Sequence, residues 1–223
     1  MSPPLIPVVP ASRLGLSGKI AAVVTAHPAR LRTGMLSRAL DSVVGQTWPV
    51  DHISVAVDWE GAGAAVTRDR ALAAVPIMCD WVAFLDSDDA WMPEHIEKLL
   101  ACAIRNEADY VYSWFMIKDA RGREHPEWDP FPKVFGCPWD PREPVQTTVT
   151  TLVRRELAQA VGFRSWGVDE ETPTPTGHTA GEDWRFTIGC MAAGAKIVHF
   201  PERTWYWYHH GANSSGCPGR GDA

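Results

Sequence analysis

The stretch WVAFLDSDD at residues 81–89 decides the fold class, because an apolar run passes directly into a cluster of aspartates. A short, continuous apolar run that ends in polar residues is typical of a strand buried on both faces of a parallel sheet. We therefore expect a strand over residues 81–86, with Asp86, Asp88 and Asp89 at its C-terminal end.

Three further apolar runs also have the composition of strands. They are KIAAVVTA at residues 19–26, HISVAVD at residues 52–58 and YVYSWFMIK at residues 110–118. Each is short and rich in β-branched or aromatic residues, which are enriched in strands. The first half of the chain is therefore expected to supply most of a sheet.

Apolar residues at helical spacing separate these runs. The first helix carries Leu36, Leu40, Val43 and Val44 on its packing face and is expected to end near Gly45. Thr67 is expected to cap the helix TRDRALAAV. A third helix opens at Pro93 and Glu94, and its apolar face consists of Ile96, Leu99, Leu100, Ala103 and Ile104.

Strands that alternate with helices predict a doubly wound α/β fold, with a mostly parallel sheet and helices on both faces. In such folds ligands bind beyond the carboxyl ends of the strands. His27, Asp58 and Asp86 each stand at such an end. We therefore expect these three side chains to lie on one edge of the sheet.

The alternation weakens in the second half, which is expected to form a smaller region beside the main sheet. A turn is expected at 119–122 and irregular chain at 124–144. Further expected elements are regular structure at 145–153, a helix at 155–161 closed by Gly162, a loop at 173–178, a helix at 181–194, and two strands at 195–200 and 204–209.

Composition limits the class of protein further. A length of 223 residues suits one compact domain, and a net charge of −6 gives no general attraction to nucleic acid. The five cysteines are odd in number, far apart and without a C-x-x-C pair, which suggests reduced thiols in a cytoplasmic protein. No apolar run approaches the roughly 20 residues that cross a bilayer, so we expect no membrane span.

The cluster Asp86-Ser87-Asp88-Asp89 places several carboxylates together with no basic residue beside them in the sequence. A hard divalent cation, shared with substrate phosphates, would neutralise such a cluster. The alternative is a polar loop that caps the helix after Pro93. D-x-D alone does not decide between a metal site and a capping loop.

An ordered set of short segments resembles the family-two glycosyltransferases of the GT-A fold. The segments are TAHPAR at 25–30, QT at 46–47, Asp58, TRDR at 67–70, LDSDD at 85–89, residues 154–163, GEDW at 181–184 and HHGANSS at 209–215. The resemblance implies transfer of a sugar from a nucleoside diphosphate sugar to an acceptor hydroxyl. UDP is the default nucleotide and Mn²⁺ or Mg²⁺ the implied cofactor.

The resemblance also assigns roles to individual residues. Those implied to hold the base and ribose of the nucleotide are Thr25, Ala26, His27, Arg30, Asp58 and Arg68. Asp86 would contact the ribose or a metal-bound water, with Ser87 beside it, and Asp88 would bind the metal directly. His210, or its neighbour His209, would complete the metal shell, and the tail at 209–223 would close over bound donor.

Asp183 is implied to be the catalytic base, and direct displacement by the activated hydroxyl would invert the anomeric centre. Its place at the start of a helix is expected to favour the anionic form, although Glu182 and Asp183 could simply cap that helix. The implied division of one GT-A domain is a tail at 1–18, a nucleotide-sugar-binding half at 19–118, an acceptor-binding half at 119–208 and the tail at 209–223.

Three rival functions are less well supported. A nucleotidylyltransferase should have a glycine-rich loop where Ala26-His27-Pro28 stands. A phosphatase should have its D-x-D after the first strand, and a degenerate sugar- or nucleotide-binding scaffold would keep the fold without turnover. The acceptor stays open between a protein, a glycan, a small molecule and a modified nucleic acid base, and so do the donor sugar and the oligomeric state.

Overall fold

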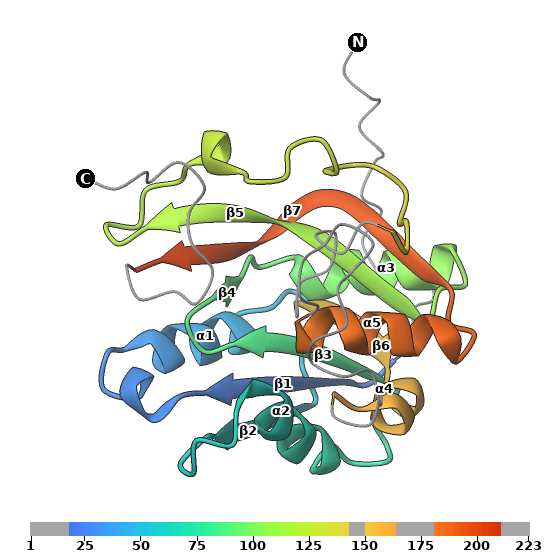
Figure 1. Cartoon of the computed structure of the whole chain (residues 1–223), viewed down its shortest axis with the longest axis horizontal. Helices are drawn as coiled ribbons and strands as arrows, with labels where there is room; N and C mark the ends of the chain where they lie inside the picture. Colours follow the sequence, from blue (N-terminus) through green and yellow to red (C-terminus); the bar gives the residue numbers. More distant parts are fainter. Residues whose placement is uncertain (1–17, 143–149, 164–180, 211–223) are drawn as a thin grey trace.

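One seven-stranded sheet runs through the molecule and carries helices on both faces (Figure 1). The computed structural model describes residues 18–142, 150–163 and 181–210. The strands are β1 Ile20–Ala26, β2 His52–Val57, β3 Trp81–Asp86, β4 Ala90–Trp91, β5 Tyr110–Asp119, β6 Thr151–Arg154 and β7 Ile197–His209. The helices are α1 Met35–Val44, α2 Ala64–Ala73, α3 His95–Arg105, α4 Arg155–Val161 and α5 Glu182–Ala192, with 3₁₀ turns at Pro28–Arg30 and Pro126–Trp128.

The strand order is β2-β1-β3-β6-β5-β7-β4. Parallel pairs join β1 to β2, β1 to β3 and β5 to β7. β6 is antiparallel to both β3 and β5, and β4 is antiparallel to β7. All strands except the short β4 and β6 therefore run in the same direction. The expected mostly parallel α/β sheet is confirmed.

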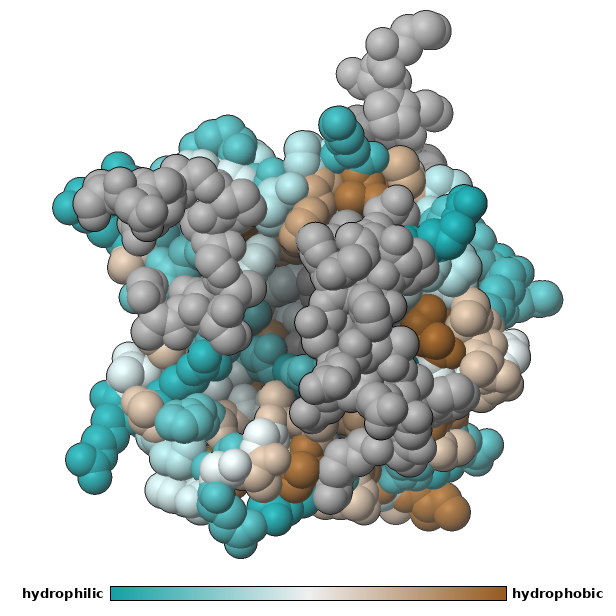
Figure 2. Space-filling view, viewed as in Figure 1, coloured by the Kyte–Doolittle hydropathy of each residue, from teal (hydrophilic) through white to brown (hydrophobic). Residues whose placement is uncertain are grey.

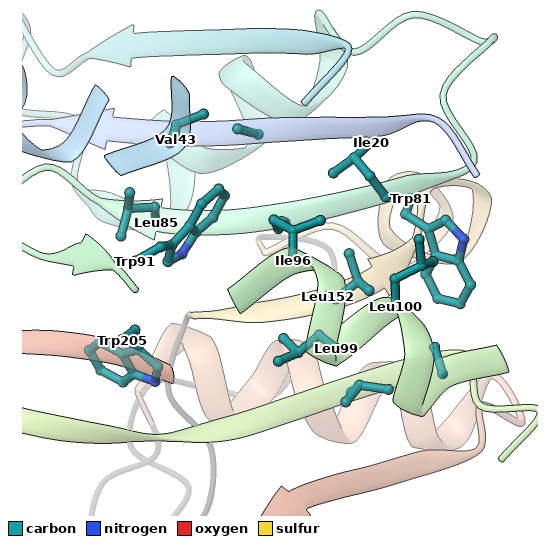
Figure 3. Close-up of a cluster of buried hydrophobic side chains, with 14 of the residues drawn as sticks. Ile20, Val43, Trp81, Leu85, Trp91, Ile96, Leu99, Leu100, Leu152 and Trp205 are labelled. Atoms are coloured by element: carbon teal, nitrogen blue, oxygen red, sulfur yellow. The ribbon is translucent and has the colours of Figure 1, made fainter. Parts of the chain in front are cut away.

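Two apolar layers enclose the sheet, as expected for strands that are apolar on both faces. On one face, Val24 packs with Val43 of α1 and Leu99 of α3. Figure 3 shows part of this layer, in which Ile96, Leu99 and Leu100 of α3 face the sheet. On the other face the layer draws on α2, α4 and α5. Every residue of β1 is buried, so this strand is the centre of the fold.

The helix that was expected to begin at Thr67 begins earlier, at Ala64, so the capping prediction is wrong. Thr67 lies inside α2, and its hydroxyl donates to the carbonyl of Gly63 at 2.8 Å. The reason is Asp58, whose carboxylate accepts the backbone N–H groups of Ala62 and Gly63. These bonds organise the turn before the helix, and Gly63 becomes the N-cap with φ near +90°.

The two strands expected at 195–200 and 204–209 are one continuous strand, β7, so this boundary prediction is wrong. The sequence pattern is interrupted at Pro201, which lies where the ladder with β5 changes register between Tyr112 and Phe115. An irregularity of this kind tolerates proline and bends the strand without ending it. The strand therefore carries on to His209, toward the aspartate cluster.

The other helix and strand predictions are confirmed to within a few residues, with two exceptions on the packing faces. Val44 is 76% exposed and Ile104 is 38% exposed, because each lies in the last two residues of its helix, beyond the packed layer. The expected features at 1–17, 145–149, 173–178 and 211–223 lie outside the described residues.

Within residues 18–142, 150–163 and 181–210, none of the helices combines the length and the apolar character that crossing a bilayer requires.

Candidate active site

The carboxyl ends of β1, β2 and β3 bring separate parts of the sequence to one sheet edge, as expected. Thr25 and Asp86 are partners in the β1–β3 ladder, and the Thr25 hydroxyl donates to the Asp86 carboxylate at 3.2 Å. The backbone N–H of Ser87 donates to the carbonyl of Thr25 at 3.0 Å. That of Asp58 donates to the carbonyl of Ala26 at 2.9 Å. The edge is thus fixed by backbone pairing.

Arg68 of α2 links this edge to the first turn of α5. Its guanidinium lies 2.9 Å from Asp86 and 2.6 Å from the Glu182 carboxylate, and its side chain is only 6% exposed. Burial by itself would lower the pKa of Arg68. The negative charges of Asp86 and Glu182 together raise this pKa by more than burial lowers it, so the net shift is upward. Arg68 is therefore a fixed positive charge between Asp86 and Glu182, two carboxylates that are far apart in the sequence.

Asp183 lies next to Glu182 at the start of α5, and its carboxylate accepts the backbone N–H of Trp184 at 2.8 Å. Burial and the neighbouring Glu182 raise the pKa of Asp183 to about 6, while Arg68 and the bond from Trp184 act in the opposite direction. We expected the N–H groups at the helix start to favour the anionic form of Asp183. This expectation is wrong, because the loss of solvation raises the pKa by more than one N–H donor lowers it. A carboxylate with this pKa is a stronger base than an ordinary aspartate and is still mostly ionised at neutral pH.

Both carboxylate oxygens of Asp88 already have partners. Arg30 Nη1 lies 2.6 Å from one oxygen, and His210 Nε2 lies 3.2 Å from the other. Arg38 donates to the backbone carbonyl of Asp88 at 2.7 Å, so the loop after β3 is held from α1 as well. The structure therefore places His210 at Asp88, whereas the ring of its neighbour His209 packs against Trp207.

Two residues that the resemblance assigned to the nucleotide also have local structural contacts. The Asp58 carboxylate accepts the N–H groups of Ala62 and Gly63, and these bonds lower its pKa. The His27 ring accepts the N–H of Ala29 at 3.2 Å and so caps the 3₁₀ turn at Pro28–Arg30. These bonds hold the side chains in place at the sheet edge.

Sequence reasoning missed the structural partners of the aspartate cluster. Asp89 is 7% exposed and accepts the backbone N–H of Tyr208 at 3.1 Å, and burial followed by Asp88 and Asp86 raises its pKa well above the ordinary value. The Arg38 guanidinium stacks on the Tyr208 ring at 3.6 Å. Arg38 is a basic residue on a helix whose other sheet-facing residues are apolar. This pattern could have revealed it from the sequence.

Ser87 follows Asp86 and is completely buried. Its hydroxyl oxygen has no hydrogen-bond partner among the described residues. A buried hydroxyl without a partner is uncommon and fits a place beside a polar ligand. The fit is consistent with the expected role of Ser87 near the nucleotide, which stays a prediction.

The donor set at Asp88 and His210 fits a divalent cation. A carboxylate oxygen and an imidazole nitrogen are ligands that suit manganese, and magnesium takes few protein ligands when substrate phosphates provide the rest. In residues 18–142, 150–163 and 181–210, no group of three or more His, Cys, Asp or Glu side chains is arranged to hold a metal ion. A metal at Asp88 would therefore depend on oxygen atoms of the donor or of water.

Near the middle of the face seen in Figure 2, hydrophilic residues of the described parts are visible. In the same view β1 and β3 run side by side and their arrowheads point the same way (Figure 1).

The mostly parallel sheet and the aspartates after β3 agree with the GT-A fold that the resemblance implies. Residues 59–162 match the family model described as Glycosyl transferase family 2, which covers just under half of the chain. With the relative and the solved structures below, this match supports a family-2 glycosyltransferase of the GT-A fold.

The succinoglycan biosynthesis protein ExoW of Rhizobium meliloti (strain 1021) is 30% identical, over 39% of this chain and 35% of the relative. Residues 1–349 of TarS from S. aureus superpose with a TM-score of 0.62 at 17% identity, over 85% of this chain and 60% of that one. The same fragment in complex with UDP-GlcNAc also gives 0.62, over 87% and 60%. The chain spans about a third of the curated relative and three fifths of the solved fragment.

Proposed function

We propose that this chain is an inverting glycosyltransferase that moves a sugar from a UDP-sugar to an acceptor hydroxyl with the help of a divalent cation. The observation that carries the proposal is the Arg68 bridge, which holds Asp86 and Glu182 on the same guanidinium. It brings the carboxylates after β3 close to the α5 turn that contains Asp183.

Donor binding is assigned to the edge formed by β1, β2 and β3. Thr25, Asp58 and Asp86 lie there on fixed backbone, with His27 at the rim. The solved structure of TarS with UDP-GlcNAc has the same fold, and it supports a uridine nucleotide for this chain. Ala26, Arg30, Arg68 and Ser87 complete the proposed donor site.

Asp183 is the proposed base. Its carboxylate accepts the proton of the acceptor hydroxyl while the oxygen forms a bond to the anomeric carbon. The bond from that carbon to the diphosphate breaks at the same time, and its electron pair leaves with UDP. Because attack and departure occur on opposite faces of the sugar, the configuration inverts.

Asp88 and His210 are proposed to hold the cation, manganese or magnesium, from two different segments. A bound divalent cation neutralises the charge that develops on the diphosphate leaving group, which favours the transition state over the ground state. Arg38 and the buried Asp89 hold the loop and β7 that carry these ligands.

A saccharide is the first acceptor class to test, because the curated relative is a protein of succinoglycan biosynthesis. A cytoplasmic location stays a prediction from the cysteine pattern. The division into a donor half at 19–118 and an acceptor half at 119–208 is proposed in the same way, with the tail at 209–223 supplying His210.

The alternative function is a scaffold that binds a nucleotide or a sugar without turnover. It differs from the transferase in one measurable respect, since a scaffold releases no UDP from a bound donor. The raised pKa of Asp183 favours the transferase, because a structural cap gains nothing from a carboxyl group with a pKa of about 6.

The test is to incubate the protein with a panel of UDP-sugars, manganese and saccharide acceptors, and to measure UDP release and the anomeric configuration of the product by NMR. We expect an inverted product with one donor and a loss of at least a hundredfold in rate for Asp183→Asn. Asp41→Asn is the control, because it removes the same charge at an exposed position of α1. UDP binding without release from any donor would support the scaffold.

A further inference from the structure

Arg30 stands out among the arginines around the aspartate cluster. It lies at the end of the short 3₁₀ turn after β1, and its side chain is 27% exposed, whereas the Asp88 side chain it contacts is 9% exposed. The contact is close, at 2.6 Å between Arg30 Nη1 and Asp88 Oδ1. The guanidinium therefore approaches a buried carboxylate from the solvent side.

The other two arginines are held by several contacts each. Arg68 bridges Asp86 and Glu182, and Arg38 both donates to the Asp88 carbonyl and stacks on Tyr208. Among the described residues, the side chain of Arg30 has Asp88 as its ion-pair partner and no further side-chain hydrogen bond. A partly exposed arginine with one anchor can reorient at little cost, since its long side chain has many rotamers.

The oxygen that Arg30 contacts belongs to the carboxylate that is proposed to bind the metal. A guanidinium and a divalent cation cannot occupy the same side of one carboxylate, because they repel each other and compete for the same lone pairs. Arginine also binds phosphate groups well, through its planar set of donors. The side chain that leaves Asp88 would thus remain beside the diphosphate.

We propose that Arg30 competes with the divalent cation for Asp88 and, once displaced, binds the diphosphate of the donor. Arg30 is then a diphosphate ligand and not a base or ribose ligand, because the structure places it on Asp88 and not on Asp58. The metal alone binds weakly, and the metal and the nucleotide strengthen each other's binding. This inference rests on the proposed function of the same site.

The first experiment titrates Mn²⁺ into the protein without nucleotide and follows free Mn²⁺ by electron paramagnetic resonance. Arg30→Gln is expected to bind Mn²⁺ about tenfold more tightly than the wild type, because its competitor is gone. Arg32→Gln is the matched control, since Arg32 is exposed two residues away and the charge change is the same. Arg30→Lys keeps the charge and should remain near the wild-type affinity.

The second experiment titrates UDP at saturating Mn²⁺ by calorimetry. Arg30→Gln is expected to bind UDP about tenfold more weakly than the wild type does. Arg32→Gln is expected to bind UDP as tightly as the wild type does. Unchanged or weaker Mn²⁺ binding by Arg30→Gln, in a wild type that binds Mn²⁺ and UDP, overturns the competition and leaves the proposed function standing. A wild type that binds neither Mn²⁺ nor UDP overturns both.

Discussion

The strongest single link between the two halves of the site is the Arg68 bridge, and its removal is the most informative change. Arg68→Met keeps much of the side-chain volume and leaves Asp86 and Glu182, each with a 30% exposed side chain, without their shared counter-charge. Removing one partner of a buried ion pair costs about 3–5 kcal/mol. Because water reaches both carboxylates, we expect the lower end of that range, about 3 kcal/mol.

Urea unfolding measures this cost. With a slope of about 2 kcal/mol per molar urea, a loss of about 3 kcal/mol lowers the midpoint by about 1.5 M. The matched control is Arg70→Met on the same helix, where the ion pair with Glu60 has a similar distance of 2.7 Å but side chains that are 45% and 70% exposed. We expect that control to lose no more than about 1 kcal/mol, as exposed pairs do.

Equal midpoints for Arg68→Met and Arg70→Met would contradict this prediction, because burial would then make no difference to the stability that the ion pair contributes. A double variant, Arg68→Met with Glu182→Gln, should recover part of the loss, since one of the two unpaired carboxylates is removed. No recovery would mean that Arg68 stabilises the fold through contacts other than the ion pair with Glu182, such as its cation–π contact with Phe163.

The remaining predictions concern Asp183. Since burial raises its pKa from 3.8 to about 6, the rate should rise with pH through about 6 as the base ionises, and an acid limb near pH 4 in the pH–rate profile would contradict this. The raised pKa also makes stability depend on pH. The contribution of Asp183 to the free energy of unfolding is fully present below pH 3.8 and is lost as the pH rises through about 6. Urea unfolding of Asp183→Asn should not show this loss. Gly181→Ala would place a Cβ 2.7 Å from the Asp183 carboxylate oxygen, so the side chain must move, and we expect at least a tenfold fall in kcat with an unchanged urea midpoint. An unchanged kcat would show that the orientation of this carboxylate is not critical.

Much of the fold could be predicted from local patterns, because strands that are apolar on both faces and helices with one apolar face have distinct periods. The run at 81–89 correctly indicated both β3 and the carboxylates at its end. The two boundary errors arose where hydrogen bonds that the local pattern does not show override that pattern. Thr67 looks like a cap, but Asp58 forms the turn one helical turn earlier. Pro201 looks like a strand end, but pairing with β5 carries the strand past it.

The site was harder to predict than the fold, because its electrostatics depend on which charges meet in space. The sequence placed Asp183 at a helix start, where an anion is favoured, but it contains no signal for the burial that raises its pKa. Nor could spacing show that Arg30 meets Asp88 or that Arg68 meets Glu182. The two residues of each pair are far apart in the sequence, and only the folded sheet brings them together.

Asp88 is proposed to belong to a metal-dependent site for a nucleoside diphosphate. The most direct measurement is a calorimetric titration of UDP with and without Mn²⁺ into the wild type, Asp88→Ala and the exposed-site control Asp41→Ala. We predict UDP binding that requires Mn²⁺, survives in Asp41→Ala and is lost in Asp88→Ala. Binding of UDP by Asp88→Ala with wild-type affinity, or no binding of any nucleoside diphosphate by the wild type, would contradict the claim.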